Sequence, residues 1–515
     1  MTEILVEYPG RFRKIPVDPG LTIAQNLFVA GFFRGIPLCS GLGHCGLCRI
    51  RFLSVPLPRP DDVESKLFST ECLEEGWRLS CRHYPDPNTH IEVRQGAPVT
   101  PFSPSSISWE KVAIDIGTTT IKWQGTQRGQ ENKVHKGQCP NPQLGGGSDV
   151  MARMGLALHG YAMQDALQQA VLDWLRSFFC FVNLGEDAPE VVITGNAVML
   201  YLLLGKPLTG LATAPYVLDY FFGEKVRIDP DVPTVYIPPL LSPFVGADIS
   251  CGISHLKHLF GETIRYPFIL ADFGTNGEFV LALAADKFLV TSVAMGPALE
   301  GVGLSQGKMA GSGVCTSFSL TPAGILPGTG RINNGISGSG YLSLLALLHR
   351  TGVLLDDGRL RCGTTPLGRR IGRQIENDHG RSTLYLDGVN ILTGQDIEEI
   401  LKVKASCNYA LEALFEHAGI KAHQITSVYL AGSLGEHFSS ADLVELGFVP
   451  LSLQHKIHAV GNTSLAGAWD LLHDPEGKKN IKDLQKQVLS IALAGEIDFT
   501  TRFVHKMFFR YVQGH

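Results

Sequence analysis

The stretch Val112-Ala-Ile-Asp-Ile-Gly-Thr-Thr-Thr120 decides the fold of the larger part of the chain, because its pattern returns at Ile269-Leu-Ala-Asp-Phe-Gly-Thr-Asn-Gly-Glu278. Each stretch is an apolar strand that ends at an aspartate, Asp115 or Asp272, followed by a Gly-Thr turn. A carboxylate at a strand end suits Mg²⁺ or its waters. The backbone N–H groups and hydroxyls of the turn suit phosphate oxygens. The duplicated pattern predicts two related subdomains, each with a phosphate-binding loop.

The sequence around these loops alternates apolar strands with amphipathic helices from about residue 111 onward, which predicts α/β architecture. Two helices are predicted over residues 161–181 and 396–418. Thr393 and Asp396 form a capping-box-like start for the second helix. Asn276-Gly277 is a strong signal for a hairpin turn.

Length and composition exclude several classes of protein. The 515 residues predict about three domains. With 44% hydrophobic and 18% charged residues, the chain has enough apolar side chains for large cores, which excludes disorder as its main state. The net charge of -5 disfavours a nucleic-acid binder. We find no charge-free apolar run of about 18 residues and no signal peptide, so we expect no membrane span and a cytoplasmic location.

The N-terminal region carries a cysteine-rich loop, Cys39-Ser-Gly-Leu-Gly-His-Cys45-Gly-Leu-Cys48, and Cys81 follows 33 positions after Cys48. A hairpin turned at Pro9-Gly10, a helix over 22–30 and a strand over 49–53 are predicted around this loop. Four thiolates at this spacing suit an iron–sulfur cluster, and the glycines of the loop let its backbone approach the sulfurs. Cys72 is the rival fourth ligand. A zinc site, which usually has two short-spaced pairs, and unliganded cysteines are the alternatives.

This cysteine spacing resembles that of the [2Fe–2S] ferredoxins, in the vertebrate-type rather than the plant-type pattern, over residues 1–96. The resemblance implies a β-grasp domain whose cluster is held by Cys39, Cys45, Cys48 and Cys81. Cys81 is preferred to Cys72 because Arg78-Leu-Ser-Cys81 resembles the final-ligand segment of that family.

The two Asp-x-Gly-Thr loops resemble the phosphate loops of the acetate kinase, sugar kinase, Hsp70 and actin (ASKHA) superfamily, and Val428-Tyr-Leu-Ala-Gly432-Ser-Leu-Gly435 resembles its adenosine motif. The resemblance implies that Mg-ATP lies between the two loops. The residues it implies for catalysis are Asp115, Asp272 and Glu278. The residues it implies for nucleotide binding are Gly117, Thr118, Thr119, Thr120, Gly274, Thr275, Asn276, Gly277, Gly432, Ser433 and Gly435.

Two of these assignments keep an alternative. Glu278 has two possible roles: it positions a water molecule or lies in the second shell of Mg²⁺, or it is purely structural. Residues 335–340 and 461–468 resemble the two segments that connect ASKHA subdomains; Ser337 and Ser339 either cap the helix that follows or face a partner. No Walker A pattern is present, so a P-loop ATPase is not supported.

The fusion of these two parts resembles the reductive activators of corrinoid proteins, over nearly the whole chain. The implied organisation is a ferredoxin domain at 1–96, a linker at 97–110 and ATPase subdomains at 111–268 and 269–515. The implied task is the ATP-dependent reduction of a Co(II) corrinoid protein to Co(I) with one electron from the cluster. An upstream electron donor and a homodimer are expected, and nucleic acid and membrane are not.

Three other interpretations stay open at this point. The first is a small-molecule kinase of the acetate and sugar kinase superfamily with a redox-sensing ferredoxin domain. The second is a plain electron carrier whose ATPase-like domain only docks partners. The third is an activator of 2-hydroxyacyl-CoA dehydratases, which fits less well because those proteins bind a [4Fe–4S] cluster through cysteines inside the ATPase domain.

Overall fold

The computed structural model divides the chain into two compact units, Met1–Tyr216 with Glu224–Ile237 and Val217–Gly223 with Pro238–His515. The structure describes residues 2–39, 41–43, 45–94, 108–182, 184–185, 187–301, 303–378, 381–386, 388–432, 438–493 and 498–514. Most of the predicted linker, residues 97–107, lies outside the described residues, and its last two positions belong to a strand.

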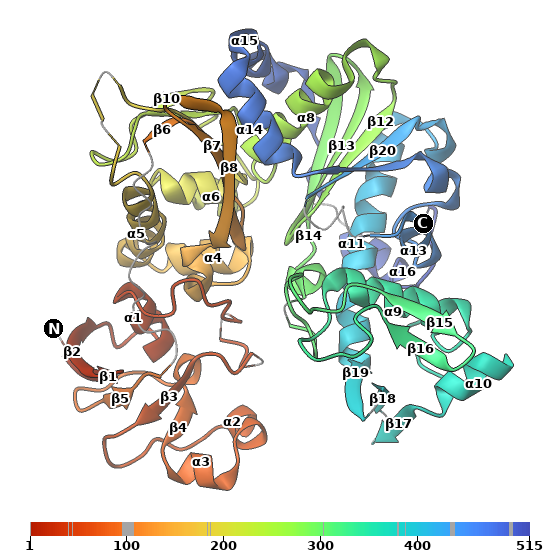
Figure 1. The fold of residues 1–515 in the computed structure, drawn as a ribbon. Coiled ribbons are helices and arrows are strands. Elements are labelled where there is room, and N and C mark those ends of the chain that lie inside the picture. The colour runs from red at the N-terminus through yellow and green to blue at the C-terminus, as the bar shows by residue number, and fades with distance from the viewer. Residues whose placement is uncertain are drawn as a thin grey trace. The chain divides into compact units, whose positions relative to one another are not determined.

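The first part of unit 1 is a small mixed sheet with the strand order β2-β1-β5-β3-β4 (Figure 1). Its strands are β1 (Thr2–Tyr8), β2 (Arg11–Val17), β3 (Arg49–Phe52), β4 (Trp77–Leu79) and β5 (His90–Glu92). Tyr8 pairs with Arg11, so the first hairpin turns at Pro9-Gly10 as predicted. Helix α1 (Ile23–Val29) begins after a Thr22–Gln25 capping box. Two short helices, α2 (Asp62–Leu67) and α3 (Thr70–Glu74), and the 3-10 turn η1 (Ser80–Arg82) complete this domain.

The rest of unit 1 is a six-stranded sheet with the order β10-β11-β9-β6-β7-β8. Its strands are β6 (Trp109–Ile116), β7 (Thr120–Gln127), β8 (Gln130–Pro140), β9 (Glu190–Gly195), β10 (Glu224–Val226) and β11 (Val235–Ile237). Its helical elements are η2 (Pro142–Gly146), α4 (Val150–Leu158), α5 (Tyr161–Phe178), α6 (Ala197–Leu203) and α7 (Thr209–Ala212).

Unit 2 repeats this plan in a second six-stranded sheet with the order β21-β20-β12-β13-β14-β22. Its strands are β12 (Phe268–Phe273), β13 (Asn276–Ala284), β14 (Lys287–Ala294), β20 (Ser427–Ala431), β21 (Ile457–Gly461) and β22 (Val488–Ser490). In both sheets three consecutive antiparallel strands are followed by two strands parallel to the first of them. The duplicated core predicted from the two Asp-x-Gly-Thr stretches is therefore present, with β6 and β12 as its equivalent first strands.

Helices cover both faces of the second sheet. Side chains alternate along β12: Ile269 packs in the core with α11 (Gly394–Ala418), while Leu270 faces α8 (Ala247–Phe260). Helix α8 also packs on α14 (Thr463–His473), so it belongs to unit 2, whereas the sequence analysis assigns residues 247–260 to the first subdomain. The predicted capping box of α11 is present between Thr393 and Asp396.

The other elements of unit 2 extend the fold beside this sheet (Figure 1). They are α9 (Gly338–Arg350), α10 (Pro366–Gly372), α13 (Ser440–Glu445), α15 (Pro475–Asp483), α16 (Phe499–His505) and the strands β15 (Phe318–Thr321), β16 (Gly324–Pro327), β17 (Ile375–Asp378), β18 (Arg381–Leu386) and β19 (Val389–Thr393).

A buried lysine on α11 holds the C-terminal segment in place. The Lys404 ammonium donates to Asn408 Oδ1 (3.0 Å), to the carbonyl of Lys506 (3.1 Å) and to the carbonyl of Arg510. Burial lowers the pKa of Lys404 from its ordinary value near 10.5 to about 7. The ammonium therefore binds two carbonyls of the segment that follows α16, those of Lys506 and Arg510.

Lys404→Met is expected to loosen this segment, because the carbonyl of Arg510 loses the Lys404 donor, and a buried acceptor left without its hydrogen bond costs ~1–3 kcal/mol. Asn408 Oδ1 and the carbonyl of Lys506 each lose one donor but keep another, from the N–H groups of Val512 and Phe508. Hydrogen exchange of amides in 499–512 should then accelerate by about tenfold or more. Lys402→Met is the matched control, because Lys402 lies on the same helix with its side chain 43% exposed. Equal exchange in both variants would contradict this role.

The same substitution has an expected pH signature. A folded-state pKa below the unfolded value means that the unfolded chain binds more protons between about pH 7 and 10.5. Stability from this group therefore rises as pH rises through that window and is lost as pH falls through it. The stability difference between wild type and Lys404→Met should grow in favour of wild type from pH 7 to pH 10.

Candidate functional site

The cysteine loop lies between α1 and β3, and the fourth cysteine lies in η1. Pairing of β3 with β4 sets Arg49 opposite Leu79, which brings Cys48 and Cys81 to the same end of the two strands. Ser80 ties this end together, since both its N–H (3.0 Å) and its hydroxyl (2.8 Å) donate to the carbonyl of Cys48. The strand register thus brings a distant part of the sequence to the loop.

The four thiols form two hydrogen-bonded pairs, Cys39 with Cys45 and Cys48 with Cys81. The hydrogen bond to Cys39, together with burial, raises the pKa of the Cys45 thiol. The hydrogen bond to Cys48, together with burial, raises the pKa of Cys81 in the same way, while its partner Cys48 has a lowered pKa. Within the described ranges, no group of three or more His, Cys, Asp or Glu side chains is arranged to hold one metal ion.

Glycines give the loop its path past the thiols. Gly41, Gly43 and Gly46 all have positive φ angles, between 61° and 90°. A Cβ on Gly43 would lie 2.7 Å from Val63 Cγ1, so only glycine fits there. The N–H of Leu47 points to Cys45 Sγ at 3.5 Å, which is the kind of contact predicted for this loop.

A buried carboxylate supports the turn that carries Cys81. Glu64 accepts from the N–H of Leu79 (2.7 Å) and that of Asp61 (3.0 Å), and it lies 3.0 Å from His83 Nε2. Burial opposes ionisation, but these hydrogen bonds outweigh it and leave the pKa of Glu64 below its ordinary value. Glu64 is not among the residues predicted from the sequence. The Asp61-x-x-Glu64 capping box was its only visible signal.

The first Asp-x-Gly-Thr loop joins β6 to β7. Asp115 is buried near the end of β6, and a Cβ on Gly117 would lie 2.6 Å from the carbonyl of Thr120, so the turn is tight. Two buried residues that the sequence analysis missed hold its carbonyls. Asn141 donates through Nδ2 to Gly117 O and through its N–H to Thr119 O, both at 2.8 Å. Arg153 donates through Nη2 to Thr118 O.

The second loop joins β12 to β13, and its turn residues are Gly274 and Thr275. The hairpin is present, but Asn276 and Gly277 lie in β13 rather than in the turn, because Phe273 pairs directly with Gly277. Thr275 is buried and donates to Glu300 Oε1 at 2.6 Å. Glu300 is a further contact residue that the sequence analysis left without a role.

Three predicted residues meet at the end of β12. Asp272 pairs in register with the buried Glu278 on β13. A Cβ on Gly432, whose φ is 86°, would lie 2.6 Å from Asp272 Oδ1. The carboxylate of the second loop and the first glycine of the adenosine motif are therefore in contact. Ser433 and Gly435 lie outside the described residues.

The two loops belong to different units, with Asp115 in unit 1 and Asp272 in unit 2.

Ser337 caps α9, because its hydroxyl accepts from the N–H of Gly340 at 3.1 Å, and it also hydrogen-bonds Ser339 at 2.8 Å. Capping, one of the two roles expected for this serine pair, is the one seen for Ser337.

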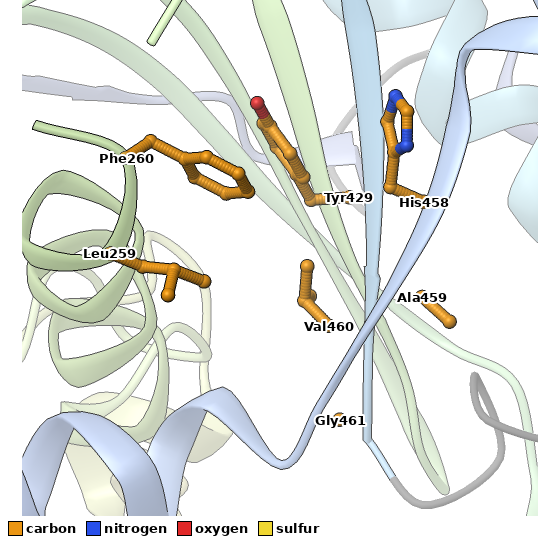
Figure 2. Close-up of a pocket in the computed structure, with 7 residues that line it drawn as sticks. All are labelled: Leu259, Phe260, Tyr429, His458, Ala459, Val460 and Gly461. Carbon is orange, nitrogen blue, oxygen red and sulfur yellow. The ribbon is translucent and has the colours of Figure 1, made fainter. Parts of the chain in front are cut away.

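Unit 2 also contains an aromatic pocket of about 600 Å³ (Figure 2). It is lined by Leu259, Phe260, Tyr429, His458, Ala459, Val460 and Gly461. The Tyr429 ring lies beside that of Phe260, with centroids 5.0 Å apart, and beside that of His458 at 5.9 Å. The lining includes none of the predicted catalytic or cofactor-binding residues.

No helix among the described residues is long and apolar enough to cross a membrane.

Comparison with known proteins gives two family matches. Residues 111–258 match the RACo middle region, and residues 267–514 match the C-terminal domain of RACo, the ASKHA domain. The chain is 26% identical over 481 residues to the corrinoid activation enzyme RamQ of Eubacterium limosum, covering 87% of this chain and 77% of that protein.

Two further comparisons extend over most of the chain. It is 24% identical to the Co(II) methylated amine-specific corrinoid protein reductase of Methanosarcina barkeri, covering 73% of this chain and 72% of that protein. A solved structure titled reductive activator for corrinoid, iron-sulfur protein has the same fold, with a TM-score of 0.67, 20% identity and 99% of each chain covered.

Proposed function

Because the chain belongs to the RACo family of reductive activators of corrinoid proteins, we propose that it reduces a Co(II) corrinoid protein to Co(I) in an ATP-dependent reaction. The observation that carries the proposal is the combination, in one chain, of a site with four thiols and two sheets that each carry an Asp-x-Gly-Thr loop. Its relatives with this activity in their names are similar over most of its length.

We infer that Cys39, Cys45, Cys48 and Cys81 bind a [2Fe–2S] cluster. The two thiol pairs support this assignment, since a four-cysteine [2Fe–2S] cluster takes two thiolates on each iron. A single zinc ion would need its ligands around one point, and the described residues offer no such group. When bound, the cluster supplies one electron at low potential. The Leu47 N–H and the positive-φ glycines of the loop keep the backbone close to the sulfurs.

We propose Mg-ATP as the nucleotide. Asp115 and Asp272 would bind Mg²⁺ or its waters, and the turns after them would donate backbone N–H groups to phosphate oxygens. The contact between Gly432 and the Asp272 carboxylate supports a shared role for the second loop and the adenosine motif. Glu278, buried opposite Asp272, would orient that carboxylate or a water molecule beside it.

The role proposed for ATP is to drive an electron transfer that we expect to be uphill, because Co(I) is expected to be harder to reach than the potential of about −400 mV at which plant-type ferredoxin clusters sit. A one-electron gap of about 100 mV costs about 2.3 kcal/mol. Nucleotide binding or hydrolysis offsets that cost if it favours a state of the complex in which cobalt is easier to reduce, and such a coupling is conformational. Each turnover also consumes an electron, so an upstream donor is required. The homodimer and the cytoplasmic location remain predictions from the sequence.

The test is the conversion of Co(II) to Co(I), followed by absorbance, with candidate corrinoid proteins, a chemical reductant and the full chain. We expect Co(I) to accumulate with ATP and not without it. Equal yields with and without ATP would favour a plain electron carrier. Phosphorylation of acetate, glycerol or a sugar by the chain would favour the kinase alternative.

Gly432→Ala is expected to lower ATP hydrolysis by about tenfold to a hundredfold, because its Cβ would displace the Asp272 carboxylate. Gly388→Ala is the matched control: its φ is a similar 79°, but a Cβ there meets nothing within 4 Å. Both variants should lose about 1–2 kcal/mol of stability from backbone strain. If the two variants hydrolyse ATP equally well, the contact with Asp272 has no role in the reaction.

A further inference from the structure

The ferredoxin-like domain packs on the first six-stranded domain within unit 1 through α1 and the turn that follows it, residues 31–35, which we call the docking turn. Arg34 Nη1 donates to Asp173 Oδ2 on α5 at 2.7 Å. Asp173 also accepts from Arg176 at 2.9 Å, and Arg176 in turn donates to Asp229 at 2.6 Å. The docking turn is thus joined to a chain of charges that belongs to the larger domain.

The surface under the docking turn is residues 141–147, which we call the seat. A Cβ on Gly145 would lie 2.4 Å from the carbonyl oxygen of Phe33 and 2.9 Å from Phe28 Cδ2. Phe33 is fully buried and has a φ of 59°, a conformation that a residue with a large side chain rarely adopts. The backbone of the seat at Gly145 therefore contacts the backbone of the docking turn at Phe33 directly, so a movement of the seat displaces the docking turn.

The seat is hydrogen-bonded to the first phosphate loop. Asn141 holds the carbonyls of Gly117 and Thr119, as described above. Arg153 links the two segments directly, because its Nε donates to Gly147 O at 2.9 Å and its Nη2 donates to Thr118 O. Asn141 and Arg153 are both fully buried. Asn141 and Arg153 therefore hold the carbonyls of the phosphate loop, and Arg153 also holds a carbonyl of the seat.

The docking turn leads directly to the first candidate cluster ligand. The N–H of Ile36 donates to Phe33 O at 3.1 Å, and that of Leu38 donates to Ile36 O at 2.9 Å. Cys39 is the next residue. A continuous series of contacts therefore runs from the phosphate loop through the seat and the docking turn to the thiol loop.

We propose that the seat couples the two sites, so that nucleotide at residues 117–119 and docking of residues 31–35 stabilise each other. This inference rests on the proposed function. Phosphate would bind the N–H groups of the loop while Asn141 and Arg153 keep its carbonyls, so nucleotide and docking order the same segment. By linkage, docking must then strengthen nucleotide binding by the factor by which nucleotide strengthens docking.

The experiment uses Gly145→Ala in the full chain with its cluster. The three atoms nearest to the added Cβ belong to Phe33 and Phe28, so the substitution strains docking at a point away from the loop donors Asn141 and Arg153. Gly155→Ala on α4 is the matched control, because a Cβ there meets nothing within 4 Å. Arg34→Glu opposes the charge of Asp173 from the other side of the interface and serves if Gly145→Ala does not fold.

The two readouts are the affinity for Mg²⁺ with a non-hydrolysable ATP analogue, by calorimetry, and hydrogen exchange of the amides of 31–38. Nucleotide should slow that exchange in wild type and in Gly155→Ala. In Gly145→Ala or Arg34→Glu it should have little effect on exchange, and the affinity should fall by about fivefold or more. Normal nucleotide binding with unchanged exchange in wild type would overturn the coupling alone. Absence of nucleotide binding in wild type would overturn the proposed function as well.

Discussion

Cys81→Ala is expected to abolish the visible absorbance of the iron–sulfur cluster, whereas Cys72→Ala should retain it. Cys81 shares a hydrogen bond with Cys48 and lies within electrostatic range of Cys39 and Cys45, so its removal leaves one iron with a single thiolate. Cys72 lies on α3, half-buried, and packs against the apolar core of its domain. The measurement is the absorbance spectrum together with iron and sulfide content of the purified chain.

Two results would contradict this assignment. A cluster that survives Cys81→Ala and disappears in Cys72→Ala would make Cys72 the fourth ligand. Zinc without iron in the wild-type chain would overturn the cluster altogether. Folding of each variant is checked by far-UV circular dichroism, so that loss of the cluster is not confused with loss of the domain.

Asp272→Asn is expected to lower ATP hydrolysis by at least about a hundredfold, and formation of Co(I) with it. The amide keeps the shape of the side chain but removes the charge that would compensate Mg²⁺. The cluster spectrum should be unchanged, since Asp272 lies in the other unit. Asp286→Asn is the matched control, because Asp286 is exposed in the turn at the opposite end of the neighbouring strand.

The decisive comparison is the Co(I) yield of wild type with ATP, wild type without ATP, and Asp272→Asn with ATP. If all three yields are equal, the ATPase-like domain is a passive dock. If ATP hydrolysis falls in Asp272→Asn but Co(I) formation does not, hydrolysis is not needed and nucleotide acts through binding alone.

Short sequence patterns predicted the fold well where the structure depends on interactions between residues close in sequence, such as turns and helix caps. The Pro9-Gly10 turn fixes the first hairpin, and the Thr393–Asp396 capping box fixes the start of α11. The two Asp-x-Gly-Thr stretches predicted the duplicated sheets, because each combines an apolar strand with a turn that starts a hairpin. The Asn276-Gly277 signal gave the hairpin but misplaced its turn by two residues, since pairing of the strands overrides the preference of a dipeptide.

The residues that the sequence analysis missed act through contacts between distant segments. Asn141 reaches back to Gly117, and Glu64 accepts from Leu79 across two strands. No motif in the sequence indicates either contact; the capping box marks Glu64 as the start of a helix but says nothing of Leu79. Composition could not show that Arg34 and Asp173 form an ion pair, because the two residues lie 139 positions apart in the sequence.

The close fit of Phe33 over Gly145 limits how this chain can diversify. A first domain taken from another protein would carry its own turn at 31–35, and any side chain added at 145 would collide with the backbone it meets. Chimeras that exchange residues 1–96 alone should therefore assemble poorly, while chimeras that exchange 141–147 with them should recover. The unit that must be exchanged as a whole is therefore the first domain together with the seat, and not the first domain cut at the linker.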